Sequence, residues 1–230
     1  AEGDPARQEL QTTLSVAIEH GLAAVSIDKN DYQNWLTLAQ LYQELAGAGV
    51  SGAYEQARAA YVEARAENPT NPLPLFRLAQ LEALQGNRDA ALSDLNEVVM
   101  LKPDFAAGYY LASQLFAQGG QLQEAAQAAA TAAQIVPQDP LAWYNLGTIL
   151  YASEKYQEAV AALGQAVTLK NDYSNALFMQ ALSHYKLGER TQALSLLIRV
   201  AELNPTDTSV PAMIRNLNAG KDPFTGLTGK

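Results

Sequence analysis

Only a few residues of this chain have the type and spacing that catalysis or metal binding requires. The 230 residues include two histidines, His20 and His184, and no cysteine. The histidines are too far apart to be metal ligands on one helix, and no nucleophile stands beside a base at a familiar spacing. The sequence therefore predicts no catalytic residue, no metal site and no cofactor, and the chain is not expected to be an enzyme.

A glycine-rich segment is a second candidate for chemistry. Residues 47–52 read Gly-Ala-Gly-Val-Ser-Gly, which has the spacing of a dinucleotide-binding loop. Such a loop follows a strand, because its glycines turn the strand into a helix whose N-terminus holds the pyrophosphate. Here a helix is expected before the segment, so we interpret it as a flexible connection between helices. An anion contact at the start of the next helix is the alternative.

The clearest chemical pattern is a row of aromatic side chains that recur every 34 residues, preceded by one leucine. The row consists of Leu36, Phe76, Tyr110, Tyr144 and Phe178. Two further rows follow it at four and seven residues, and they consist of Gln40, Gln80, Gln114, Thr148 and Leu182, then Gln43, Ala83, Ala117, Tyr151 and Tyr185. Aromatic faces bury apolar side chains and amides pair with a peptide backbone, so the rows favour binding of a peptide or a partner helix.

The same period runs through the elements that must position these rows. Prolines or their substitutes lie 34 residues apart, at Pro69, Pro103, Pro137, Asn171 and Pro205. Two rows of small residues accompany them, at Ala57, Ala91, Ala125, Ala159 and Ala193, and at Ala39, Ala79, Ser113, Gly147 and Ala181. Small residues let two helices approach closely, and a repeat of this length predicts a helical solenoid.

Helix starts and turns agree with the repeat. Three pairs offer an N-cap acceptor followed by proline at the first helical position, namely Asp4-Pro5, Asn71-Pro72 and Asp139-Pro140. Glycines fall where the two helices of a unit meet, at Gly86, Gly119, Gly120 and Gly188. Each unit is therefore expected to be two helices and a short turn. Scattered carboxylates such as Glu44, Glu82 and Glu158 are interpreted as solvated helix faces.

At this point the sequence resembles the tetratricopeptide repeat family, most clearly in Trp143-Tyr144-Asn145-Leu146-Gly147 with Tyr151, Ala159, Ala166 and Asn171. The resemblance implies an all-α, right-handed superhelix of five units, 32–71, 72–105, 106–139, 140–173 and 174–207. A helix in 1–31 is expected to pack on the first unit, with a capping helix in 208–219 and a flexible tail in 220–230. His184 stands where the family has a packed aromatic residue, so we interpret it as a packing histidine.

In that family the aromatic row points to a concave face, which implies a peptide-binding groove. Its expected residues are Leu36, Gln40, Gln43, Leu73, Phe76, Arg77, Gln80, Tyr110, Gln114, Tyr144, Thr148, Tyr151, Phe178 and Tyr185. Only Arg77 and Lys186 add positive charge along the rows. Leu36 and Gln40 stand where relatives that clamp a C-terminal carboxylate have lysine and asparagine, so binding of that kind is not expected. Generic scaffold chemistry, without a ligand, is the alternative.

Charge narrows the class of partner. The net charge of -9 opposes nucleic acid and anionic lipid, so a protein or peptide partner is favoured. Neither a signal peptide nor a transmembrane helix is expected from this sequence, which leaves self-association and cellular location open.

Two functions follow from these observations. The first is a non-catalytic interaction scaffold that binds a peptide or partner helix in an aromatic and amide-lined groove. The alternative is a structural, self-assembly or spacer domain of a larger bacterial cell-envelope membrane protein. The run from Asn216 to Phe224 resembles the ends of tetratricopeptide domains on multi-spanning proteins similar to O-antigen ligases.

Overall fold

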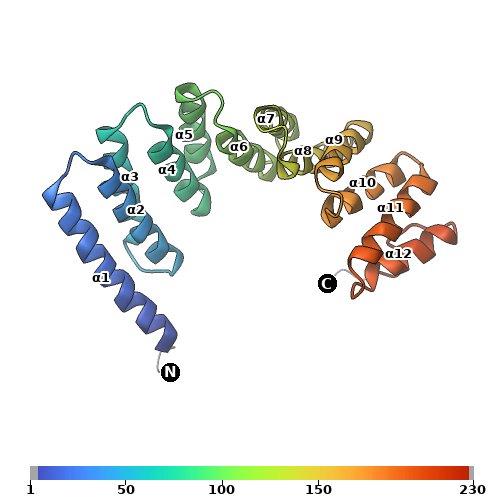
Figure 1. The fold of residues 1–230 in the computed structure, drawn as a ribbon, viewed down its shortest axis with the longest axis horizontal. Coiled ribbons are helices and arrows are strands. Elements are labelled where there is room, and N and C mark those ends of the chain that lie inside the picture. The colour runs from blue at the N-terminus through green and yellow to red at the C-terminus, as the bar shows by residue number, and fades with distance from the viewer. Residues whose placement is uncertain (1–4, 228–230) are drawn as a thin grey trace. The chain divides into compact units, whose positions relative to one another are not determined.

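The computed structural model describes residues 5–227, and in this part of the chain every regular element is an α-helix (Figure 1). The helices are α1 (Pro5–Ile27), α2 (Tyr32–Gly47), α3 (Ala53–Glu67), α4 (Pro72–Leu84), α5 (Arg88–Leu101), α6 (Ala106–Gln118), α7 (Leu122–Ile135), α8 (Pro140–Ala152), α9 (Tyr156–Leu169), α10 (Ser174–Lys186), α11 (Arg190–Leu203) and α12 (Ser209–Asn218). The predicted all-α repeat fold is confirmed.

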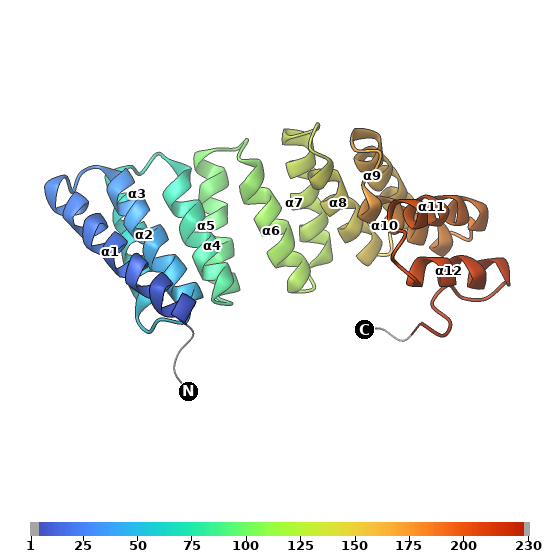
Figure 2. The same ribbon diagram turned by 60° about the horizontal axis from the view of Figure 1, so that its bottom comes forward.

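The chain divides into two units, residues 1–108 and 109–230. In the first, α2 packs on α3 and α4 packs on α5, so each pair forms a hairpin. In the second, α8 packs on α9 and α10 on α11, and Figure 2 shows these pairs side by side. A helix in such an array is stabilised mainly by its neighbours along the chain.

The small residues lie where the helices of a hairpin approach most closely. Each alanine of the first small row, from Ala57 to Ala193, is fully buried. At Gly147 of α8, an added Cβ would lie 2.5 Å from Cγ of Leu163 on α9. No carbon atom can occupy that space without movement of the helices, so the α8 and α9 contact requires glycine.

Local hydrogen bonds explain where several helices begin. The side chains of Asn71 and Asp139 accept from the backbone N–H of Leu73 at 3.0 Å and of Leu141 at 2.9 Å. These two predicted N-caps are confirmed, whereas Asp4 lies outside the described residues. Asp31 caps α2 in the same way, which the sequence pattern did not indicate because no proline follows it.

The turns inside the hairpins use a left-handed residue. Gly86, Gly120 and Gly188 have φ between 75° and 80°. The hairpin of α8 and α9 has no glycine at this place, and Glu154 adopts φ 59° instead. The left-handed conformation is sterically unfavourable for a non-glycine residue, because its Cβ approaches the backbone.

The ends of the array are covered by single helices. In the first unit α1 packs on α2, and an added Cβ at Gly21 would lie 3.1 Å from Cδ1 of Leu38. In the second, α12 packs on α11 and buries Val210, Met213 and Leu217.

Residues 220–227 form turns against α12, although their composition predicts a flexible tail. The side chain of Asn216 donates to the carbonyls of Pro223 at 3.0 Å and Thr225 at 2.8 Å. Pro223 is fully buried. The rest of the predicted tail, residues 228–230, lies outside the described residues.

Candidate functional site

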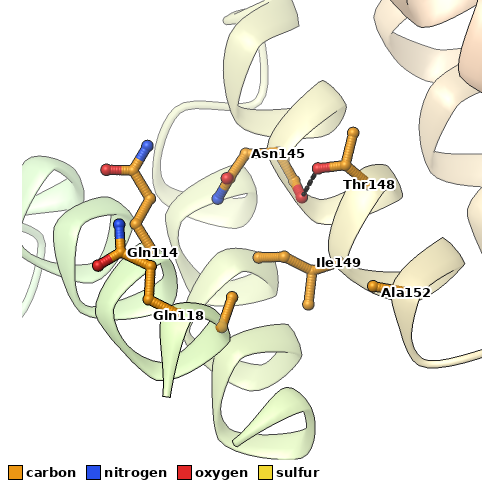
Figure 3. A pocket seen from close by; sticks show the side chains of 7 residues that line it. Gln114, Gln118, Asn145, Thr148, Ile149 and Ala152 are labelled. Carbon is orange, nitrogen blue, oxygen red and sulfur yellow. Dashed lines mark hydrogen bonds between the residues drawn. The ribbon is translucent and has the colours of Figure 1, made fainter. Parts of the chain in front are cut away.

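Amide and hydroxyl side chains of α6 and α8 surround a hollow of about 360 Å³ in the second unit. We call it the amide hollow, and its lining residues are Gln114, Ala117, Gln118, Asn145, Thr148, Ile149 and Ala152. Figure 3 shows the side chains of Gln114, Gln118 and Asn145 around the same space. None of the lining residues is charged, so the hollow offers hydrogen-bond donors and acceptors without a full charge.

The side chain of Asn145 is fixed by a hydrogen bond to a residue of α6. Only 9% of the residue is exposed, and its Nδ2 donates to Oγ of Ser113 at 2.8 Å, while that hydroxyl donates to the carbonyl of Tyr110 at 2.7 Å. The hydroxyl of Thr148 donates to the backbone carbonyl of Asn145 at 2.8 Å (Figure 3). No described group donates to Oδ1 of Asn145, so a fixed acceptor remains beside Gln114 and Gln118.

Three tyrosines form a second group in the same unit. The rings of Tyr144 and Tyr173 lie 5.1 Å apart, and Tyr110 interacts electrostatically with Tyr144 and Asp139. Burial raises the pKa of both Tyr110 and Tyr144. Their hydroxyls therefore stay protonated at neutral pH and can donate hydrogen bonds.

The predicted residues at the α10 end, Phe178 and Tyr185, pack against a buried cluster with Leu177, Leu197 and Met213. The hydroxyl of Tyr185 donates to Oδ2 of Asp222 at 2.9 Å. A residue expected to face a ligand is thus bonded to the chain's own C-terminal segment.

In the first unit, most of the predicted side chains serve packing or bond to one another. Phe76 is buried and makes an edge contact with Phe105 at 5.0 Å. Gln43 accepts from the hydroxyl of Tyr61 at 2.7 Å.

The predicted charged residue of this unit is also partly engaged. Arg77 donates from Nη1 to Oε1 of Gln80 at 3.0 Å, and its buried Nε has no partner among the described residues. Leu36 and Leu73 are half-buried, and Gln40 is exposed. Of the predicted groove residues, Gln114 and Thr148 line the amide hollow of the second unit.

Sequence reasoning missed several residues of these groups. Asn145, Gln118 and Ile149 line the hollow, and the ring of Tyr173 packs against that of Tyr144 at a tilt of 40°. Asn145 could have been found, because the 34-residue column directly after the aromatic row reads Arg77, Leu111, Asn145 and Met179. Tyr173 lies in the connection between α9 and α10, where helical spacing gives no signal.

Glu82 was predicted to lie on a solvated helix face, and that prediction is wrong. Only 3% of the residue is exposed. It accepts hydrogen bonds from the Tyr54 hydroxyl at 2.8 Å, from Nε of Arg58 at 2.9 Å and from Nδ2 of Asn87 at 2.7 Å. Burial alone would raise the pKa of Glu82, but these bonds together lower it. The carboxylate therefore ties α3, α4 and the following turn together.

His184 is mostly buried, as a packing histidine should be, but it also has a polar partner. Its Nδ1 lies 2.5 Å from Oε2 of Glu189, five residues further on. The described residues contain no group of three or more histidine, aspartate or glutamate side chains arranged to hold a metal ion.

Comparison with known proteins defines the class. The tetratricopeptide repeat model matches residues 51–115 and 150–217, which is more than half of the chain. This chain therefore belongs to the tetratricopeptide repeat family, whose members are generally interaction scaffolds without catalytic activity.

Particular relatives are more distant. The tetratricopeptide repeat and J domain-containing co-chaperone DNJ1 of Fusarium oxysporum is 28% identical over 76% of this chain and 34% of its own length. A TPR repeat-containing protein of Methanocaldococcus jannaschii is 23% identical over 89% of this chain and 36% of its own. The chain thus spans about a third of the length of these relatives.

Among solved structures, YrrB, described as a TPR protein with an unusual peptide-binding site, superimposes with a TM-score of 0.68. The match covers 84% of this chain and 96% of YrrB at 15% identity, so it shows the fold alone. In residues 5–227, no helix combines the length and apolar character needed to cross a bilayer.

Proposed function

We propose that the second unit binds a peptide or partner helix of another protein at the amide hollow and the neighbouring tyrosines. The observation that carries this proposal is the fixed Asn145, whose Nδ2 is bonded to Ser113 while its Oδ1 has no described donor. A polar group held in place before binding loses little conformational entropy when it pairs with a ligand.

The neutral lining supports a particular ligand chemistry. Gln114, Gln118 and Asn145 offer amide donors and acceptors that match a peptide backbone, and Tyr110 and Tyr144 offer aromatic faces to apolar side chains. A ligand selected by this surface would be mainly uncharged where it crosses α6 and α8. The peptide-binding site described for YrrB is consistent with this proposal.

A peptide library displayed on phage tests the proposal with purified protein. We expect selected 12-residue peptides to bind the wild-type chain, and we expect Tyr110→Ala with Tyr144→Ala to weaken them at least about tenfold, as loss of aromatic anchors does. Gln134→Ala, an exposed amide on α7, is the matched control and should leave binding unchanged. If no peptide is enriched, or if the double variant binds as wild type does, the proposal fails.

A second candidate is self-assembly, and α1 favours it. Among its described side chains, this helix exposes the large apolar residues Val16 and Leu22 at 48% and Ile27 at 87%. Light scattering separates the two functions, because Leu22→Glu should abolish an assembly built on α1 but leave peptide binding intact. A monomeric wild-type chain would argue against assembly. Attachment to a membrane-bound parent stays a prediction of the sequence resemblance.

A further inference from the structure

The C-terminal segment 221–227 contacts α10 through Asp222. One carboxylate oxygen, Oδ2, accepts from the hydroxyl of Tyr185 at 2.9 Å, and the other, Oδ1, accepts from the backbone N–H of Phe224 at 2.8 Å. This first bond joins residues 37 positions apart in sequence. Tyr185 belongs to the third of the rows that recur with the repeat, the row that begins with Gln43. Asp222 therefore turns its own segment and fastens it to α10.

Apolar contacts and backbone bonds hold the same segment. Leu227 packs against the buried cluster that Phe178 and Tyr185 also contact. Pro223 is fully buried, and Asn216 of α12 donates to two carbonyls of the segment. Phe224 is 43% exposed and adds little to this contact. The segment thus combines a carboxylate, a turn and an apolar anchor against one end of the second unit.

We propose that residues 221–227 are a resident ligand of the α10 part of the predicted groove, which a partner must displace to reach Tyr185 and the buried cluster against which Leu227 packs. This inference rests on the proposed function, because it treats Tyr185 as a further contact of the partner that binds at the amide hollow. The partner segment that replaces them carries the same chemistry, namely a carboxylate for the Tyr185 hydroxyl and an aliphatic side chain for the cluster beside Phe178. An intramolecular ligand competes at high effective concentration, so the covered end admits only a well-matched partner.

Proteolysis of the full chain tests whether the segment is held by Tyr185. Trypsin cleaves after Lys221, and cleavage requires release of the segment from α10. Tyr185→Phe removes only the hydroxyl that bonds Asp222, so we expect cleavage to be about fivefold faster, as loss of one hydrogen bond gives. Tyr151→Phe is the matched control, because no described group bonds its hydroxyl. Equal rates for wild type and Tyr185→Phe would overturn the proposal.

A peptide added in trans tests whether the covered surface recognises that chemistry. The probe is a fluorescent peptide of residues 219–230, measured by anisotropy against the full chain and against its Asp222→Asn, Leu227→Ala variant. We expect the variant to bind the probe at least about tenfold more tightly than wild type, and a probe carrying Asp222→Asn to bind several-fold more weakly. Absence of binding to the variant, or equal binding by both chains, would overturn the proposal.

The peptide library and the proteolysis experiment together distinguish this inference from the proposed function. Library peptides that bind wild type and lose affinity in the Tyr110, Tyr144 double variant support the proposed function whatever the segment does. If those peptides bind but Tyr185→Phe leaves cleavage unchanged, only the resident ligand is wrong. If no library peptide binds but cleavage accelerates, the segment is held by α10 and the binding role of the amide hollow is wrong.

Discussion

Two buried or half-buried carboxylates of the first unit respond oppositely to their surroundings. Glu82 keeps its charge because three donors satisfy it, whereas burial, together with the charges of Glu82 and Glu97, raises the pKa of Asp94 to about 6. Two arginines act against this rise, Arg65, which pairs with Glu97, and Arg58, which pairs with Glu82. In this cluster the charged form of Asp94 therefore destabilises the folded state. Protonation of Asp94 at lower pH removes that destabilisation.

The Asp94 pKa predicts a pH dependence of stability. Its folded value lies above the unfolded value of about 3.9, so the folded state binds the proton more tightly and gains stability as pH falls from about 6 to about 4. We expect Asp94→Asn to raise the free energy of unfolding at pH 7.5 by on the order of 2 kcal/mol and to change it little at pH 4. Urea unfolding at both pH values measures this difference.

Asp89→Asn is the control for that measurement, because its side chain is 94% exposed and the substitution removes the same formal charge. It should change the free energy of unfolding by less than about 0.5 kcal/mol at either pH. A gain for Asp94→Asn that is equal at pH 4 and pH 7.5 would contradict the titration argument.

At the scale of elements, the hairpins could be predicted from sequence and the site only in part. The helices could be predicted from the repeated alanines and from the N-caps Asn71 and Asp139. Close packing and capping depend on nearby residues and recur with the period of the repeat. The contacts of Asn145 and Tyr173 could not be assigned in this way, since their partners Ser113 and Tyr144 lie about 30 residues earlier in the chain. Asp222 lies outside the repeat and Tyr185 lies inside it, so the periodicity of the sequence does not indicate their contact.

The α8 and α9 contact predicts a large effect from one methyl group. We expect Gly147→Ala to lower the free energy of unfolding by about 1–3 kcal/mol, because its Cβ would overlap Leu163. Gly164→Ala on α9 is the matched control. There the Cβ would meet only the flexible end of Gln180, at 3.1 Å, so gained helix propensity should make it neutral or stabilising. Chemical denaturation compares the two, and equal losses would count against the close approach.

The turn between the same helices predicts the opposite change. Glu154 adopts φ 59°, where glycine has no steric cost, so Glu154→Gly should raise the free energy of unfolding by about 0.5–1 kcal/mol. Gly188→Ala, at φ 80° in the next hairpin, should lower it by a similar amount. Thermal melting of both variants measures the pair, and a destabilised Glu154→Gly would show that the turn has another constraint.

At the scale of the whole molecule, helix contacts run mainly between neighbours along the chain. The described contacts join successive helices, apart from α8 with α10, and they fall into two units. In arrays of this kind stability is approximately a sum of local and nearest-neighbour contributions. A defect in one hairpin should therefore act over a short distance in sequence.

Hydrogen exchange of the Gly147→Ala variant measures how far that defect extends. Opening of α8 and α9 removes contacts that α7 and α10 make with them, so we expect amide exchange to accelerate in α7–α10 by at least about fivefold. Amides of α2–α5, which belong to the first unit, should exchange at the wild-type rate. Acceleration shared equally by α2–α5 and α8–α9 would instead mean that the two units unfold as one cooperative body. Only in that case does a local loss of stability lower the free energy of opening in both units.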